Sequence, residues 1–230
     1  MPEIRRLGLL EGAAGAEGFA VIIDVLRAGS FACYALGAGA RRILAVSEVE
    51  DALALKLRNP DWLLAGERGG EPPPGFDCGN SPAGLAGIDL SGRTVIHCTS
   101  AGTRGISAAF RSADATVVGC FANAGAVARS IREAGPGVVS LVCMGTEGVS
   151  RADEDEAFAD YLQACLEGLE ADADAHLERV RSSPSGALFA SGDRPGRPSR
   201  DLALCADLDR FAFVPAVTGS REGHPVLTRI

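Results

Sequence analysis

The sequence has few lysines, few aromatic residues and no long apolar stretch. Only 5% of its 230 residues are aromatic, and Lys56 is the one lysine among 22 lysines and arginines. No apolar run approaches the roughly 20 residues that a membrane-spanning helix needs. The N-terminal segment also lacks the apolar stretch that follows the basic residues of a secretion signal. We therefore expect a cytoplasmic protein with no membrane partner.

Cysteine occurs in an odd number and without the spacing of a metal site. No Cys-x-x-Cys pair exists among the seven cysteines, which are Cys33, Cys78, Cys98, Cys120, Cys143, Cys165 and Cys205. This argues against a disulfide framework and against a zinc site. We expect most of these thiols to be small buried residues in a reducing compartment.

The charge and the composition limit the choice of partners. The net charge is −8, which argues against nucleic acid as the main partner, because binding to phosphate backbones needs a basic surface. An acidic protein can still bind a small anionic metabolite if a few arginines are held in one pocket. With 47% hydrophobic residues the chain can bury a full core, and we expect a single domain over residues 1–230. A homo-oligomer is left open.

Short apolar runs alternate with helical patterns along the chain. We expect strands at residues 19–23, 61–64, 94–97, 115–118, 138–142 and 211–214, the last one stopped by Pro215. We expect helices at residues 30–36, 49–57, 124–134 and 154–169. The alternation predicts an α/β fold with a largely parallel sheet. The Ser- and Pro-rich segment 182–200 is expected to be a surface connection with a short helix at 184–191.

Polar loops follow the predicted strands. In open α/β sheets, ligands bind outside the carboxyl ends of the strands. Carboxylates suit Mg²⁺, and arginines and backbone amides suit phosphate. The pattern therefore predicts a site for an anion and a hard metal ion, with candidate residues Asp24, Arg27, Glu67, Arg68, Thr103, Asn123 and Glu147.

Specific motifs in these loops resemble a known family. They are Asp24-Val25-Leu26-Arg27-Ala28, Gly66-Glu67-Arg68-Gly69-Gly70, Gly75-Phe76-Asp77, Gly79-Asn80-Ser81-Pro82, Thr99-Ser100-Ala101-Gly102-Thr103-Arg104 and Glu154-Asp155. In this order and spacing they resemble the 2-phosphosulfolactate phosphatase family. The resemblance runs from about Phe19 to Leu162 and, more weakly, to Pro215. The block from Gly66 to Pro82 is long and unusual, which makes the match specific.

The resemblance implies a fold and an activity. The fold is a three-layer α/β/α arrangement with a largely parallel or mixed central sheet. The activity is Mg²⁺-dependent hydrolysis of 2-phosphosulfolactate to sulfolactate and phosphate, in the route to coenzyme M. Mapped onto this sequence, the catalytic residues are Asp24, Arg27, Glu67 and Arg68. The substrate-binding residues are Asn80, Ser81, Gly102 and Thr103. The metal ligands are Asp24, Glu67, and Glu154 or Asp155.

This sequence departs from the family's usual pattern at three positions. Gly29 stands where the family usually has Thr, Ala101 where it has Asn, and Asp160 where it has Gly. Two of these lie in the predicted site loops.

Two alternatives remain open on the sequence. Cys98 is followed by five residues and then Arg104, a spacing that resembles the loop of cysteine-dependent protein tyrosine phosphatases. In that reading Cys98 is the nucleophile and needs no metal. The other alternative is a non-catalytic binder of anionic metabolites, which is motivated by the departures at Gly29 and Ala101.

Overall fold

The computed structural model describes residues 1–192 and 196–230. Within them, nine strands form one sheet: β1 (Glu3–Gly8), β2 (Phe19–Ile23), β3 (Arg42–Val46), β4 (Leu63–Gly66), β5 (Thr94–Cys98), β6 (Ala115–Gly119), β7 (Val138–Cys143), β8 (Pro215–Arg221) and β9 (His224–Arg229). The helices are α1 (Leu9–Ala14), α2 (Ala28–Gly37), α3 (Val49–Arg58), α4 (Gly102–Ala109), α5 (Ala124–Ala134), α6 (Asp153–Glu167), α7 (Ala173–Ser182), α8 (Pro184–Ala190) and α9 (Arg200–Cys205).

The sheet consists of two parallel halves joined by an antiparallel hairpin. Its strand order is β1-β7-β2-β6-β8-β9-β3-β5-β4. The strands β1, β7, β2 and β6 are parallel to one another, as are β3, β5 and β4. Between the halves, β8 and β9 pair antiparallel with each other, with β6 and with β3. The mixed sheet that was expected is thereby confirmed.

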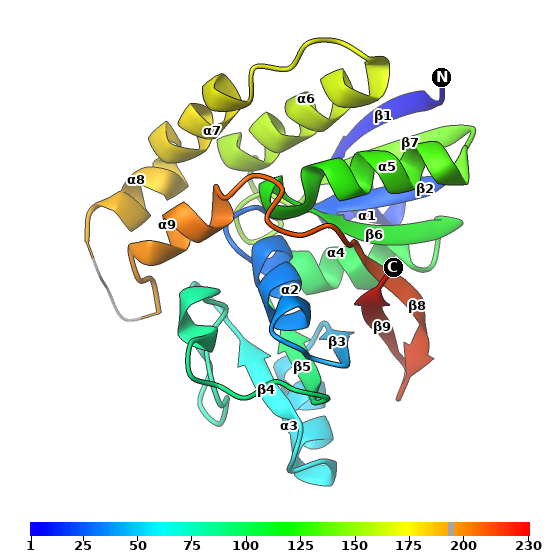
Figure 1. The fold of residues 1–230 in the computed structure, drawn as a ribbon. Coiled ribbons are helices and arrows are strands. Elements are labelled where there is room, and N and C mark those ends of the chain that lie inside the picture. Colours follow the sequence, from blue (N-terminus) through cyan, green and yellow to red (C-terminus); the bar gives the residue numbers. More distant parts are fainter. Residues whose placement is uncertain (193–195) are drawn as a thin grey trace.

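Twist brings the carboxyl ends of both halves together. Three antiparallel pairings separate β6 from β3, so in a flat sheet the two halves would end at opposite edges. Neighbouring strands rotate by about 20–25° each, which sums to roughly 100–125° over the five steps from β2 to β5. Figure 1 shows the result, with the strand β2 running at a steep angle to the strand β4. The ends of the two halves therefore converge on one region.

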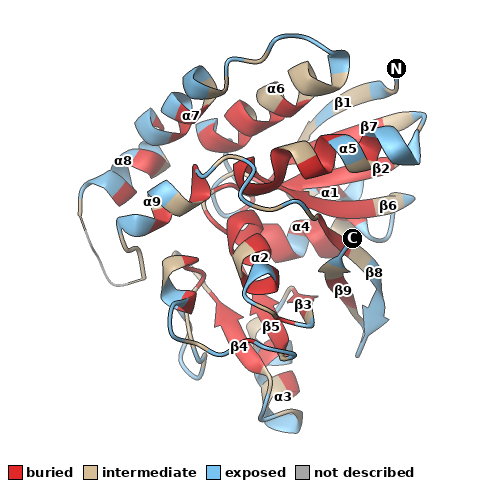
Figure 2. Ribbon diagram, in the orientation of Figure 1, coloured by how far each residue is buried: buried red, intermediate tan, exposed pale blue. Residues whose placement is uncertain are grey.

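Helices cover both faces of the sheet. The outer face of β2 packs on α5 and α6 in one cluster that contains Val21, Phe121 and Phe158. The outer face of β3, β4 and β5 packs on α3. Residues of α2 and α4 share a third buried cluster with the inner faces of both halves, including Ile22 and Phe31. Figure 2 shows the buried strands between helices whose outward faces are exposed, which is the three-layer α/β arrangement.

Most of the predicted elements exist, with shifted ends. The helix predicted at 124–134 is α5, and the one at 184–191 is α8, which ends at Ala190. The predicted strand 61–64 begins two residues late, at Leu63, and continues to Gly66. Residues 193–195 of the predicted connection lie outside the described residues. The seven cysteines are free, as expected, and no described helix is long and apolar enough to cross a membrane.

The predicted strand at 211–214 is wrong. The strand there is β8, and Pro215 begins it rather than stopping it. A proline lacks the N–H that a ladder needs, but it is tolerated as the first residue of a strand. The apolar run before it packs outside the sheet. Phe211 donates its backbone N–H to the carbonyl oxygen of Ala122, and its ring packs edge-on against Tyr34 of α2.

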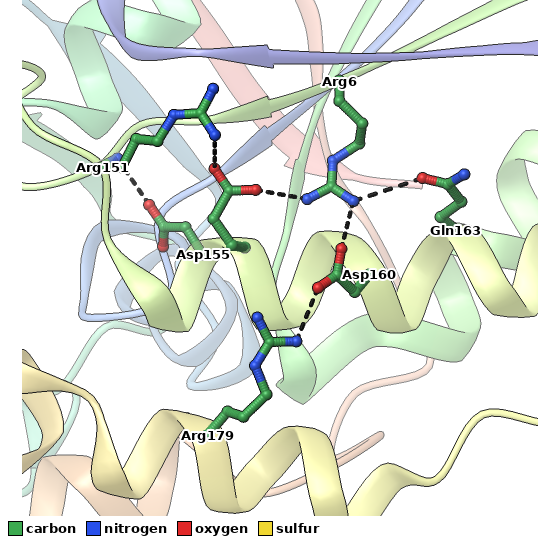
Figure 3. Close-up of polar contacts among 8 residues, drawn as sticks. Arg6, Arg151, Asp155, Asp160, Gln163 and Arg179 are labelled. Atoms are coloured by element: carbon green, nitrogen blue, oxygen red, sulfur yellow. Dashed lines mark hydrogen bonds and ion pairs between the residues drawn. The ribbon is translucent and has the colours of Figure 1, made fainter.

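An ion-pair network ties the edge strand β1 to the helices α6 and α7. Arg6 of β1 lies 2.6 Å from Glu156 and 2.7 Å from Asp160, both on α6. Asp160 also binds Arg179 of α7 at 2.7 Å. Figure 3 shows Asp160 between the two guanidinium groups. The carboxylate of Asp160, one of the departures from the family pattern, is therefore bound to two arginines on the molecular surface.

We expect the substitution Asp160→Asn to lower the free energy of unfolding modestly. Its side chain is 43% exposed, and exposed ion pairs contribute about 0.2–1 kcal/mol each. Urea unfolding at low salt and at 1 M salt measures this, and the loss should shrink at high salt because of screening. The matched control is Glu178→Gln, whose single pair with Arg181 is longer, at 3.5 Å. A loss that is equal at both salt concentrations would contradict the ion-pair account.

Candidate active site

A pocket of about 140 Å³ lies where the two halves of the sheet converge. The loops after β2, β4, β5 and β7 line it, together with the first turn of α6 and one side of α8. Its lining includes the polar residues Asp24, Arg27, Glu67, Asn80, Ser100, Thr146, Glu147, Glu154, Asp155, Ser185 and Arg197. The pocket lies at the carboxyl ends of the strands, where the site was expected.

Asp24 follows β2 and lies between the first turns of two helices. Its Oδ1 accepts a hydrogen bond of 2.9 Å from the N–H of Ala28, at the start of α2. Its Oδ2 faces α4 so closely that a β-carbon on Gly102 would lie 2.8 Å away. Glycine at position 102 therefore permits this approach, although Gly102 itself does not line the pocket.

The side chain of Glu67 fastens two loops of the other half of the sheet. Its Oε1 accepts from the backbone N–H of Ser100 at 2.8 Å, and its Oε2 accepts from the N–H of Gly70, also at 2.8 Å. The hydroxyl of Ser100 adds a third bond of 3.2 Å. The loops after β4 and β5 are thus joined through one carboxylate on the wall of the pocket.

Two acids open α6. The oxygens of Asp155 accept from the N–H groups of Val25 and Gly145, both at 2.8 Å, so this buried carboxylate joins the ends of the neighbouring strands β2 and β7. Glu154 is 3% exposed, and its Oε2 has no hydrogen-bond partner among the described residues. A buried polar atom without a partner is uncommon, and a bound water molecule or cation would satisfy it.

Burial raises the pKa of two aspartates in this pocket, Asp24 and Asp155. Asp24 is raised from 3.8 to about 7, first by desolvation and then by the charges of Glu67 and Glu154, against the opposing effect of the Ala28 amide and Arg27. The pKa of Asp155 is raised well above its usual value, again mainly by desolvation and then by Asp24. The pocket therefore holds protons near neutral pH that a bound cation would displace.

Arg27 is fixed by a residue that sequence reasoning missed. Its Nη1 lies 2.7 Å from Asp201 Oδ2 and 2.6 Å from the carbonyl oxygen of Gly196, and its guanidinium stacks 5.1 Å from the ring centre of Phe189. Asp201 is fully buried and also accepts from the hydroxyl of Ser81. In the sequence Asp201 has only the signature of an acid in the first turn of a helix, so nothing there predicted this role.

Seven of the predicted site residues line the pocket together: Asp24, Arg27, Glu67, Asn80, Glu147, Glu154 and Asp155. Five do not: Arg68, Ser81, Gly102, Thr103 and Asn123. Arg68 donates to the carbonyl oxygens of Glu67 and Ser47, away from the pocket. Thr103 donates to the carbonyl oxygen of Val46, and its hydroxyl accepts from the N–H of Thr99. The side chains of Arg68 and Thr103 therefore hold loops in place. Ser81 donates to Asp201, the carboxylate that binds Arg27.

The three departures from the family pattern fall in different places. Ala101 lines the pocket. Gly29 lies in the first turn of α2, where a β-carbon would stand 2.8 Å from the carbonyl oxygen of Asp24. Asp160 belongs to the surface network.

Cys98 and Arg104 do not share the pocket. Cys98 is fully buried in the cluster beneath α3, and burial raises the pKa of its thiol. The guanidinium that contacts its sulfur, at 3.3 Å, is that of Arg68. Arg104 is exposed and lines a separate groove.

The donor set of the pocket fits a hard metal ion, although the described part of the chain contains no preformed cluster of ligands. Among the described residues, no three His, Cys, Asp or Glu side chains are grouped as metal ligands. Mg²⁺ needs fewer protein ligands than this, because it keeps several waters and binds through one or two carboxylates and the oxygens of a phosphate. The carboxylate oxygens of Asp24 and Glu154, one of them without a partner, match that requirement.

The fold and the pocket define a three-layer α/β protein with an acidic ligand site at its strand ends. The family model described as 2-phosphosulpholactate phosphatase matches residues 9–220. The chain therefore belongs to the 2-phosphosulfolactate phosphatase family, as its motifs indicated.

Several relatives match over most of their length. A probable 2-phosphosulfolactate phosphatase of Deinococcus radiodurans is 38% identical, over 84% of this chain and 82% of its own length. Proteins given the same name in Thermus thermophilus and Bacillus subtilis are 34% and 32% identical, over 90% and 91% of this chain and the same shares of their own.

We expect the substitution Asp24→Asn to stabilise the metal-free protein at pH 8 more than at pH 5. The folded-state pKa of about 7 exceeds the unfolded value near 3.9, so the stability that protonation gives is lost as pH rises between these values. An asparagine is neutral at both pH values. Thermal unfolding in EDTA measures the difference, and about 1 kcal/mol shifts the Tm of a chain of this size by about 2–4 °C. Equal shifts at both pH values would contradict the raised pKa.

Removing the partner of Arg27 should be strongly destabilising. The substitution Asp201→Ala leaves a buried guanidinium without its counter-charge, which costs about 3–5 kcal/mol in comparable sites. The control Ser81→Ala removes one hydrogen bond to a charged group, worth about 1.5–3 kcal/mol. Urea unfolding measures both. If Asp201→Ala proved the milder change, Arg27 would have another anchor.

Proposed function

We propose that the chain is a Mg²⁺-dependent phosphomonoester hydrolase that converts 2-phosphosulfolactate and water into sulfolactate and phosphate. Membership of the family and the names of the relatives support the substrate. The observation that carries the metal requirement is the charge balance of the pocket.

The lining of the pocket carries too many acidic groups to bind an anionic phosphate ester without added cations. Among the residues that the structure describes, the lining carries two guanidinium groups, Arg27 and Arg197, against five carboxyl groups, those of Asp24, Glu67, Glu147, Glu154 and Asp155. A phosphate ester that bears a second acid group is itself a polyanion, so such a pocket repels it unless cations neutralise the carboxylates. Protons held by Asp24 and Asp155 supply part of this neutralisation. A divalent cation supplies the rest.

Asp24 and Glu154 are the proposed metal ligands, and Glu67 and Asp155 shape the site around them. Glu67 and Asp155 each bind two backbone N–H groups and so hold the loops at fixed distances. Mg²⁺ bound there would polarise the phosphoryl oxygen and neutralise its developing charge. The metal would stay bound through hard oxygen atoms, which the lining provides.

The chain's own residues bind and orient the ester. Arg27, held by Asp201, keeps its guanidinium in one place without reorganisation on binding. The pocket of about 140 Å³ is small compared with the roughly 300–1,000 Å³ of sites for drug-sized ligands, which favours a compact metabolite. Hydrolysis breaks the phosphorus–oxygen bond of the ester, and the leaving oxygen takes a proton. The attacking group is a water molecule or the carboxylate of Asp24, and trapping of a phosphoenzyme in single-turnover experiments separates the two.

Phosphate release from 2-phosphosulfolactate, with Mg²⁺ and with EDTA, tests the proposal. We expect turnover with Mg²⁺ and its loss with EDTA. The substitution Glu154→Gln should lower kcat/KM by about 10²–10³, the size found when one electrostatic group of a site is removed. The matched control is Asp153→Asn, since this neighbouring acid is exposed and does not line the pocket.

Two further outcomes decide between the alternatives. Turnover that survives EDTA but is lost in Cys98→Ser would replace the metal mechanism by the cysteine mechanism. No turnover, combined with thermal stabilisation by the ester, would favour a binding role.

A further inference from the structure

His97 lies behind the pocket wall, in contact with a residue that lines it. His97 is the fourth residue of β5 and is 1% exposed. Its Nε2 lies 2.8 Å from Oδ1 of Asn80. Its ring stacks on Phe31 of α2, with the ring centres 4.5 Å apart and the planes 25° from parallel. The imidazole therefore has one orientation, and Asn80 is its polar neighbour on the side of the pocket.

The ring of His97 is neutral in the folded protein. Burial lowers the pKa of His97 to about 3. A neutral imidazole carries one N–H, and its two nitrogens have opposite hydrogen-bonding roles. Because Nε2 faces the carbonyl oxygen of Asn80, which only accepts, the proton is on Nε2, and His97 donates this hydrogen bond.

That donation determines which end of the Asn80 amide faces the ligand. Asn80 is 4% exposed and lines the pocket. With Oδ1 bound to His97, the Nδ2 group and its two hydrogens are directed away from His97, and Nδ2 has no acceptor among the described residues. If the amide were reversed, its oxygen would face a pocket already lined by carboxylates such as Glu67 and Glu154. The pocket would then lose a donor and gain an acceptor.

We propose that His97 is a positioning residue that keeps the amide nitrogen of Asn80 directed into the pocket, where it donates to an oxygen of the substrate's anionic group. His97 itself does not touch the substrate. By donating to Oδ1, His97 keeps the amide of Asn80 from turning over. The amide then presents its N–H donors to the ligand, which favours an anion. For an amide that is nine-tenths buried, such a partner also replaces the water that would satisfy its oxygen.

The tautomer can be measured without any turnover. Long-range ¹H–¹⁵N NMR spectra distinguish protonated from unprotonated ring nitrogens, and the chain has only three histidines, His97, His176 and His224. The signals that vanish in His97→Gln belong to His97. We expect the Nε2–H tautomer with no titration between pH 5 and pH 8. The Nδ1–H tautomer would mean that Asn80 turns its oxygen to the pocket, as for a metal ligand, and would overturn the proposal.

The kinetic test rests on the proposed function. We expect His97→Leu to raise KM for 2-phosphosulfolactate by about tenfold and to change kcat by less than about twofold, because the lost interaction is made equally in the ground and transition states. His97→Gln keeps an N–H donor and should recover most of the loss. The control His224→Gln lies on β9, outside the pocket, and should leave KM unchanged.

A double-mutant cycle separates positioning from mere packing. In an Asn80→Ala background, His97→Leu should have no further effect on KM, since the group that His97 positions is absent. Effects that simply multiply would show that His97 acts through general stability, and would overturn the proposal. If no variant and no wild-type protein hydrolyses the ester, the proposed function fails, while the NMR result still decides the role of His97.

Discussion

Keeping several carboxyl groups together out of water is the constraint on which the rest of the structure depends. Two of the buried acids are compensated by backbone N–H groups: Asp155 by those of Val25 and Gly145, and Asp24 by that of Ala28. Such donors are free only where strands end and helices begin. This explains why the pocket lies where the ends of both sheet halves meet, and why Glu154, whose Oε2 lacks such a partner, is the group best prepared for a ligand.

Much of the fold and part of the site could be predicted, because both depend on local patterns. Apolar runs that end in polar loops identified β2, β5, β6 and β7, and the strand-end rule placed Asp24 and Glu67 together. The hairpin β8–β9 could not be placed in the middle of the sheet, because its position depends on pairing with β6 and β3, far away in the sequence. Local composition carries no record of such pairing.

The predicted site residues that lie outside the pocket could not be recognised as such for a related reason. Glu67 and Arg68 are neighbours in one glycine-rich loop, yet the first faces the pocket and the second bonds to Ser47 on the other side. Which of two adjacent residues faces inward depends on the loop's backbone, which the sequence motif does not specify. Asp201 was missed because its partner Arg27 is 174 residues away in the chain.

The central position of the hairpin also has a consequence for the order of folding during synthesis. The strands of both halves, from β1 to β7, leave the ribosome before residues 215–229, which join the halves. Until then, β6 and β3 each expose an unpaired edge, and such edges are sites of aggregation. The converging walls of the pocket can take their final relation only after the hairpin has inserted. The ligand site is therefore completed late, by residues that contribute no side chain to it.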